Sequence, residues 1–168
     1  EISAFLVPAG TSGMTVEAAY KKMGWHASDT HPISFQNCVV SGQNMLGERG
    51  AGLKQFLSIL DDGRIAIASL AVGLAQGCLD ESIRYANERS AFGRPIGANQ
   101  SISNRCADME VAVTAARQLV YLAAWKKDTG QDYRKDAAIA KLFATEAAVE
   151  VSRSATQVFG GYGFIDET

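Results

Sequence analysis

The feature of this sequence that most restricts its fold is a change of hydrophobic period near residue 50. Before that point, apolar residues alternate over short runs that glycine-rich turns interrupt, which is typical of β-strands. After it, apolar residues recur at spacings of three, four or seven, which is typical of α-helices. The sequence therefore predicts a mainly α chain with a short β section at its beginning.

The helical pattern falls into three long segments, at about residues 51–88, 99–129 and 133–159. Short turns between long helices favour an antiparallel up-and-down bundle, of which this chain would supply three of four helices. The stripes that we assign are Leu53, Phe56, Leu60, Ile67, Leu70, Leu74 and Cys78 in the first segment, Ile102, Cys106, Met109, Val113, Ala116, Val120 and Ala123 in the second, and Ala138, Leu142, Thr145, Val149 and Ser152 in the third.

Residues 1–49 contain the strand-like runs EISAFLVP and HPISFQNCVV. Three or four short strands cannot close a barrel or bury both faces of a sheet. We therefore expect residues 1–49 to pack against the helices or against chain that lies outside this sequence. The chain begins in a strand-like run and stops directly after FIDET, so we interpret it as a fragment.

Composition excludes several classes of protein. The chain is 47% hydrophobic and 20% charged with a net charge of -2, which is ordinary for a globular protein and gives no basic surface for nucleic acid. No apolar run approaches the roughly 18 residues of a membrane span. Three scattered cysteines and two histidines predict neither a disulfide scaffold nor a metal site. Such a chain fits the bacterial cytoplasm or the mitochondrial matrix.

Two stretches carry unusual groups of residues. In ANERSAFGRPIG (86–97), Arg89 and Phe92 stand where a helix ends. A guanidinium group binds phosphate, and an aromatic ring stacks on a flat ligand. In QVFGGYGF (157–164), an amide precedes glycines that permit close approach of a ligand to the backbone. Taken alone, each stretch is also explained as an ordinary helix end.

Two weaker candidates lie elsewhere in the helical part. In LDDGRIAIA (60–68), Asp61, Asp62 and Arg64 interrupt an apolar stripe, so they line a site or form the solvent face of a bend at Gly63. Gln100 stands at a helix start, where a surface amide is the ordinary interpretation.

Taken together and in order, these stretches resemble the acyl-CoA dehydrogenase family. The resemblance rests on KMGWHASDT, ISFQNCVV, LGERGAGLKQFLSILDDGR, YANERSAFGRPIGANQSI and AAIAKLFATEAAVEVSRSATQVFGGYGF, and it runs from about Ala4 to the last residue. It implies a middle β domain, with residues 1–49 as the last part of its β-barrel or sheet, followed by a four-helix bundle, with residues 50–168 as that domain without its last helix. It also implies FAD as cofactor, and a homo-oligomer, normally a tetramer, with FAD contacts across the subunit interface.

The resemblance also implies roles for single residues. Arg89, Phe92 and Gln100 match residues that contact the FAD of a neighbouring subunit. Gln157, Gly160 and Gly161 match the segment that holds the adenosine side of FAD. Asp61 and Arg64 match positions near the acyl-CoA substrate.

For the full-length protein, the resemblance implies dehydrogenation of an acyl-CoA to a trans-2-enoyl-CoA, with an electron-transfer flavoprotein as electron acceptor. The catalytic base of most members is a Glu that we expect beyond Thr168, and in other members it stands where this chain has Gly63. We therefore expect no catalytic residue in residues 1–168, and an isolated fragment that is inactive and lacks part of the flavin site. The alternatives are an acyl-CoA oxidase or flavin monooxygenase of the same fold, and a non-catalytic helical assembly module.

Overall fold

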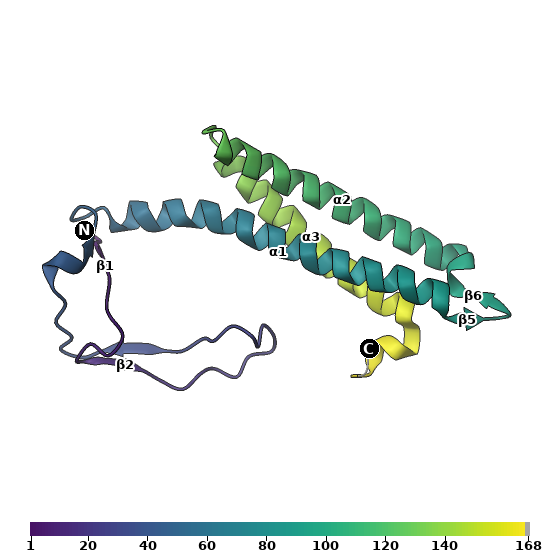
Figure 1. Cartoon of the computed structure of the whole chain (residues 1–168), viewed down its shortest axis with the longest axis horizontal. Helices are drawn as coiled ribbons and strands as arrows, with labels where there is room; N and C mark the ends of the chain where they lie inside the picture. Colours follow the sequence, from purple (N-terminus) through teal and green to yellow (C-terminus); the bar gives the residue numbers. More distant parts are fainter. Residues whose placement is uncertain (167–168) are drawn as a thin grey trace. The chain divides into compact units, whose positions relative to one another are not determined.

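The computed structural model describes residues 1–166 and divides the chain into two compact units, Glu1–Ser58 and the residues from Ile59 onward. Helix α1 (Gly52–Glu88) starts in the first unit and provides the first helix of the second (Figure 1). The domain boundary that we predicted after residue 49 concerns the whole protein and stays a prediction.

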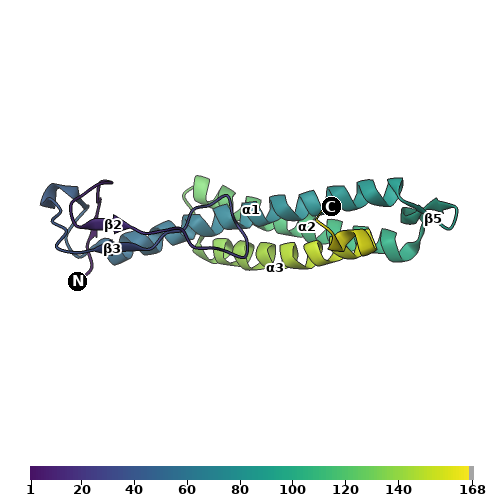
Figure 2. The same cartoon turned by 90° about the horizontal axis from the view of Figure 1, so that it is seen from below.

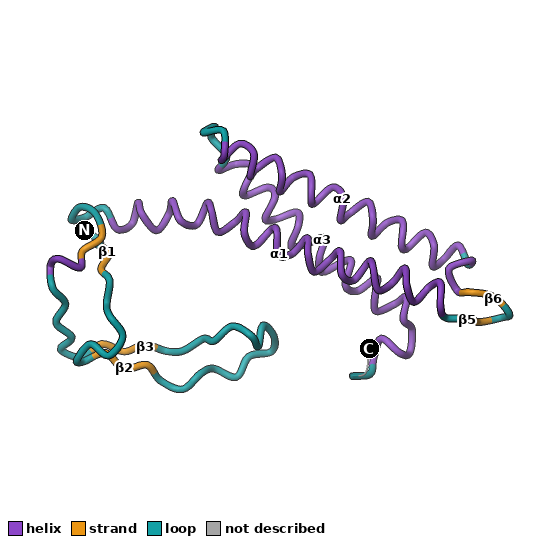
Figure 3. Tube along the Cα trace, in the orientation of Figure 1, coloured by secondary structure: helices purple, strands orange, loops and turns teal. Residues whose placement is uncertain are grey.

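The first unit contains two small antiparallel pairs of strands (Figure 3). Strand β1 (Ala4–Phe5) pairs with β4 (Met45–Leu46), which follows the short 3-10 helix η1 (Gly42–Asn44). Strand β2 (Met14–Val16) pairs with β3 (Ile33–Phe35) in a register that sets Thr15 opposite Ser34. These strands are shorter than the predicted runs, and they do not close a barrel.

The second unit is an antiparallel arrangement of α1, α2 (Gln100–Asp128) and α3 (Arg134–Phe159), as Figures 1 and 2 show. The observed bounds lie within a residue or two of the predicted ones, so the prediction of a mainly α fold with three antiparallel helices is confirmed. Within the part of the chain that the structure describes, no helix has an apolar stretch of the length that a bilayer requires.

Two different connections join the helices. A hairpin of β5 (Ser90–Ala91) and β6 (Arg94–Pro95), followed by the 3-10 helix η2 (Ile96–Ala98), leads from α1 to α2. A turn at Gly130, whose φ of +72° suits glycine, leads from α2 to α3.

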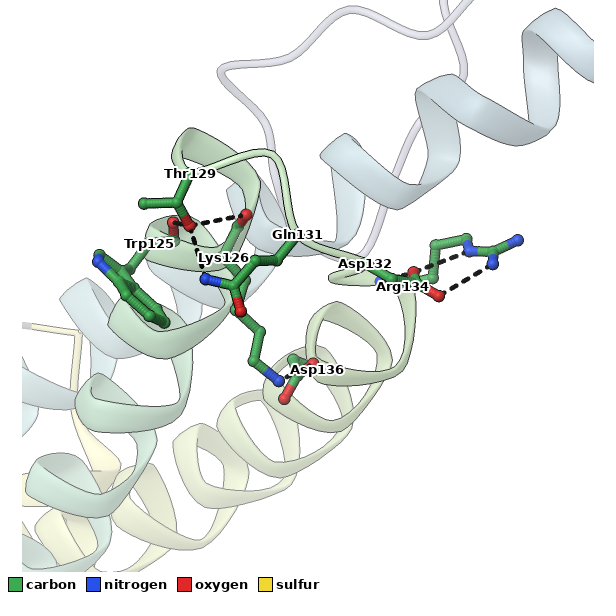
Figure 4. A network of polar contacts seen from close by, with 7 residues as sticks. All are labelled: Trp125, Lys126, Thr129, Gln131, Asp132, Arg134 and Asp136. Carbon is green, nitrogen blue, oxygen red and sulfur yellow. Dashed lines mark hydrogen bonds and ion pairs between the residues drawn. The ribbon is translucent and has the colours of Figure 1, made fainter.

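Polar contacts fasten the second connection (Figure 4). The Thr129 hydroxyl donates to the carbonyl of Trp125 at 2.8 Å, and the Gln131 amide donates to the Thr129 hydroxyl at 3.0 Å. Lys126 on α2 forms an ion pair of 2.7 Å with Asp136 on α3. Because both members of this pair are mostly shielded from solvent, it fixes the turn better than an exposed pair would.

The core of the second unit consists mainly of small side chains. Its buried members are Ala68, Ala71, Val72, Ala75, Leu79 and Ala86 on α1, Met109, Val113, Ala116, Val120 and Ala123 on α2, and Ala140, Ala144, Ala148, Val151, Ala155 and Val158 on α3. Alanine at these positions lets helix backbones approach closely, and α2 and α3 are the most closely packed pair.

The stripe predicted for α2 is confirmed, because its central residues are buried. The stripes assigned to α1 and α3 are helical in period, but they are wrong as buried faces. Leu70 and Leu74 on α1 and Leu142 on α3 are 52%, 58% and 63% exposed. The reason is that large and small apolar residues follow the same period on adjacent faces, and the small ones form the buried core of the unit.

Candidate functional site

Arg89 follows the last residue of α1 and has a firmly held backbone. Its amide donates to the carbonyl of Tyr85 at 2.8 Å, and its carbonyl accepts from the amide of Ile96 at 2.8 Å. The first bond extends the helix by one residue, and the second ties it to the segment that enters α2. The side chain is exposed, so its base is fixed while its guanidinium stays accessible.

The Arg89 guanidinium lies over the ring of Tyr162, with 5.5 Å from its central carbon to the ring centroid. Within residues 1–166, Arg89 has no acidic partner. Arg84, on the same helix, differs because it pairs with both Glu81 and Glu88. The positive charge of Arg89 is therefore available to an anion.

The turn that carries Tyr162 is the 3-10 helix η3 (Gly160–Phe164), which directly follows α3. Gly160 has a φ of +60°, which a glycine adopts without strain. A Cβ on Gly163 would lie 2.6 Å from the carbonyl oxygen of Thr156, so only glycine lets the turn pack back against α3. These glycines place the Tyr162 ring beside the end of α1.

A cavity of about 480 Å³ lies between the end of α1 and this turn, and Arg89, Gly161 and Tyr162 line it. Its floor includes Tyr85 and Phe159, whose rings stack with centroids 4.3 Å apart and an angle of 16° between their planes. A Cβ on Gly161 would meet nothing within 4 Å, so the space beside its backbone is open. The cavity combines an aromatic wall, a cation that no described carboxylate neutralises, and accessible backbone.

The other predicted cofactor residues lie outside the lining of this cavity. Phe92 stands at the tip of the β5–β6 hairpin with a φ of +55° and a fully exposed ring. Gln100 is the first residue of α2, and Gln157 lies in the last turn of α3, both exposed. Gly160 follows the last residue of α3 and is the first residue of η3, beside Gly161. The structure thus unites Arg89 and Gly161, while the roles of all these residues stay predictions.

Asp61 and Arg64 form a separate group on α1. They make an ion pair with each other one turn apart, and the Asp61 side chain is only 15% exposed. They precede Arg89 by about 25 residues, which is about 38 Å along a helix. The predicted substrate residues on α1 therefore lie far along the helix from Arg89.

Sequence reasoning missed a polar cluster beside this pair. The Tyr133 hydroxyl donates to the Asp62 carboxylate at 2.6 Å, and Lys127 donates to it at 2.9 Å. The hydrogen bond from Tyr133 and the Lys127 cation lower the pKa of Asp62 below its usual 3.8. The same hydrogen bond raises the pKa of Tyr133. No spacing in the sequence signals this cluster, because its members are about 70 residues apart.

The sequence analysis also assigned no role to Tyr162, although this residue lies in the QVFGGYGF stretch. The signal was the aromatic residue between two glycines, which is unusual for a plain helix stop. Only the return of α3 to the end of α1 brings this ring under Arg89.

Known proteins resemble this chain over almost its full length. A family model described as the C-terminal domain of acyl-CoA dehydrogenase matches residues 50–168. The protein named "Probable acyl-CoA dehydrogenase YngJ" of Bacillus subtilis is 47% identical over 166 residues, which are 99% of this chain and 44% of that protein.

Two solved structures have the same fold. Butyryl-CoA dehydrogenase from Megasphaera elsdenii matches with a TM-score of 0.96 and 44% identity, over 99% of this chain and 43% of that one. The structure of PigA with FAD and proline matches with a TM-score of 0.94 and 34% identity, over 98% of this chain and 43% of that one.

The fold and the match of the family model define a helical domain of the acyl-CoA dehydrogenase type. The chain belongs to the acyl-CoA dehydrogenase family. It spans less than half of the length of the relatives that it matches.

Proposed function

We propose that the full-length protein is an FAD-dependent acyl-CoA dehydrogenase that converts an acyl-CoA thioester to a trans-2-enoyl-CoA and passes electrons to an electron-transfer flavoprotein. The observation that carries this proposal is Arg89, whose guanidinium has no carboxylate partner among residues 1–166 and shares one cavity with Gly161 of the GGYG turn. Arg89 and Gly161 are the meeting point of the two motifs that most resemble the family. The cytoplasm of a bacterium and the mitochondrial matrix are the compartments we propose.

The geometry around Arg89 fits the pyrophosphate of FAD. A pyrophosphate needs cationic donors, and Arg89 has no described carboxylate to displace. The open space beside Gly160 and Gly161 admits a ligand against the backbone. The cavity of about 480 Å³ accommodates a part of a dinucleotide, with other parts of the protein supplying the rest.

Within this proposal, each residue has a distinct task. Arg89 neutralises phosphate charge, and Phe92 presents an aromatic face from the tip of its hairpin. Gln100 and Gln157 supply amide groups that donate and accept hydrogen bonds. The exposure of Phe92 supports a contact outside its own subunit, and so a homo-oligomer, with a tetramer as our proposal.

The reaction further requires a substrate site and a base. We assign Asp61 and Arg64 to the acyl-CoA side, where their mutual ion pair leaves the Arg64 side chain 41% exposed. FAD, when bound, accepts the hydride that leaves the β-carbon of the substrate. A carboxylate must remove the α-proton. Gly63 carries no side chain, so we place this base on a Glu beyond Thr168.

The test is the flavin content of the full-length protein. We expect Arg89→Ala to raise the Kd for FAD about tenfold to a hundredfold, because it removes charge-assisted hydrogen bonds. Arg134→Ala is the matched control, since Arg134 pairs with Asp132 at the other end of α3. Unchanged flavin retention in Arg89→Ala would favour the helical assembly module.

The same protein distinguishes the flavoenzyme alternatives. Reduction of an electron-transfer flavoprotein by an acyl-CoA without oxygen consumption supports a dehydrogenase. Formation of hydrogen peroxide from oxygen would indicate an oxidase, and incorporation of oxygen into product would indicate a monooxygenase.

A further inference from the structure

We propose that Tyr162 is a positioning residue, which holds the Arg89 guanidinium in the orientation that receives a phosphate. This inference rests on the proposed function, because it concerns how the flavin site is prepared. Tyr162 acts through Arg89 and is not assigned a contact with the cofactor.

Arg89 needs to be oriented before it binds an anion. An exposed arginine side chain has several rotatable bonds, and ordering it on binding costs conformational entropy. Among the described residues, the Tyr162 ring is the group that the structure records against the Arg89 guanidinium. A guanidinium held beforehand loses less entropy when the anion arrives.

The attraction between Tyr162 and Arg89 differs in kind from an ion pair. A cation near an aromatic ring is attracted by the electrons of the ring face, which supplies no carboxylate acceptor for the N–H donors of the guanidinium. A carboxylate partner would use those donors, as Glu81 and Glu88 do with Arg84. Tyr162 therefore stabilises Arg89 without competing with a phosphate.

Tyr162 is itself held in place by the contacts of its segment. One helical turn before Arg89, Tyr85 stacks on Phe159, which comes three residues before Tyr162. Two aromatic contacts thus join the same two chain segments in parallel. Gly163 then holds η3 against α3, since no larger residue fits beside the carbonyl of Thr156.

The experiment is a double-mutant cycle in the full-length protein, with the Kd for FAD measured by titration of the apoprotein. Tyr162→Leu should raise this Kd about two- to fivefold, the range of an exposed cation–π contact. Tyr162→Phe keeps the ring face and should bind FAD as the wild type does. In an Arg89→Ala background, Tyr162→Leu should cause no further loss.

Several results would overturn the inference. An equal loss with and without Arg89 would mean that Tyr162 contacts the cofactor or supports the fold. A loss in Tyr162→Phe as large as in Tyr162→Leu would assign the effect to the hydroxyl. Tyr162→Met replaces the leucine variant if circular dichroism shows that the latter is unfolded. If Arg89→Ala alone leaves the Kd unchanged, the proposed flavin site itself is wrong. The other results contradict only the role of Tyr162.

Discussion

At the scale of single residues, the contacts that matter most lie between helices that are distant in sequence. Asp62 on α1 accepts from Tyr133 and Lys127, which flank the α2–α3 turn. Arg89 at the end of α1 meets Tyr162 after the end of α3. The first contact joins α1 to one end of the helical unit, and the second joins it to the other end. The first contact lies beside the candidate substrate residues Asp61 and Arg64, and the second contains the candidate cofactor residue Arg89.

The Asp62 cluster leads to a pH-dependent prediction. The pKa of Asp62 is lower in the folded state than its usual 3.8, so the ionised form stabilises the fold. This stabilisation is fully present above about pH 4 and is lost as the pH falls through the folded-state pKa. We expect Asp62→Asn to lower the midpoint temperature of thermal unfolding at pH 7. We also expect the midpoint of this variant to fall less than that of the wild type as the pH drops below 4.

Thermal unfolding of the full-length protein between pH 2 and 8 measures this effect. Tyr133→Phe should act in the same direction, because it removes the hydroxyl that donates to Asp62. Asp128→Asn, an exposed position on α2, is the control. An Asp62→Asn variant with the pH profile of the wild type would contradict the prediction.

At the scale of elements, α3 depends on a face of small residues. Ala140, Ala144 and Ala148 are buried at successive turns, and each leaves room for a neighbouring helix to approach. A side chain larger than alanine there must displace a backbone or adopt a strained rotamer. The composition of this face therefore fixes how closely α2 and α3 pack.

We expect Ala144→Leu to destabilise the full-length protein by roughly 1–3 kcal/mol, the usual cost of overpacking. Ala107→Leu on the exposed side of α2 is the matched control and should leave the unfolding midpoint nearly unchanged. Differential scanning calorimetry of both variants checks this. If Ala144→Leu and Ala107→Leu unfold at the same midpoint, α2 and α3 move apart at little cost in free energy.

At the scale of the whole molecule, many large apolar side chains of the helical unit are exposed. A groove of about 670 Å³ runs between α1 and α3, with Gly73, Leu74 and Gly77 on one side and Ala155 and Phe159 on the other. Exposed apolar surface of this kind usually contacts another part of a protein or another subunit. The chain spans less than half of its relatives' length, so we expect the full-length protein to cover this groove.

A charge in the groove tests that expectation. Leu74→Asp should lower the unfolding midpoint of the full-length protein or reduce its oligomeric state, because a covered carboxylate is costly without a partner. Light scattering after gel filtration gives the oligomeric state. Ser69→Asp, an exposed position on the same helix, is the control. Wild-type behaviour of Leu74→Asp would mean that solvent reaches the groove in the full-length protein.

The sequence by itself determined the helices and their bounds, because hydrophobic period and glycine position are local properties that a helix either satisfies or breaks. It also located the two motifs at residues 86–97 and 157–164. Tertiary structure alone decided which apolar face is buried, since Leu70 and Leu74 have the same period as Ala71 and Ala75. It also decided that Tyr162 lies under Arg89 and that Tyr133 reaches Asp62. These contacts depend on how three helices return past one another, which no local spacing encodes.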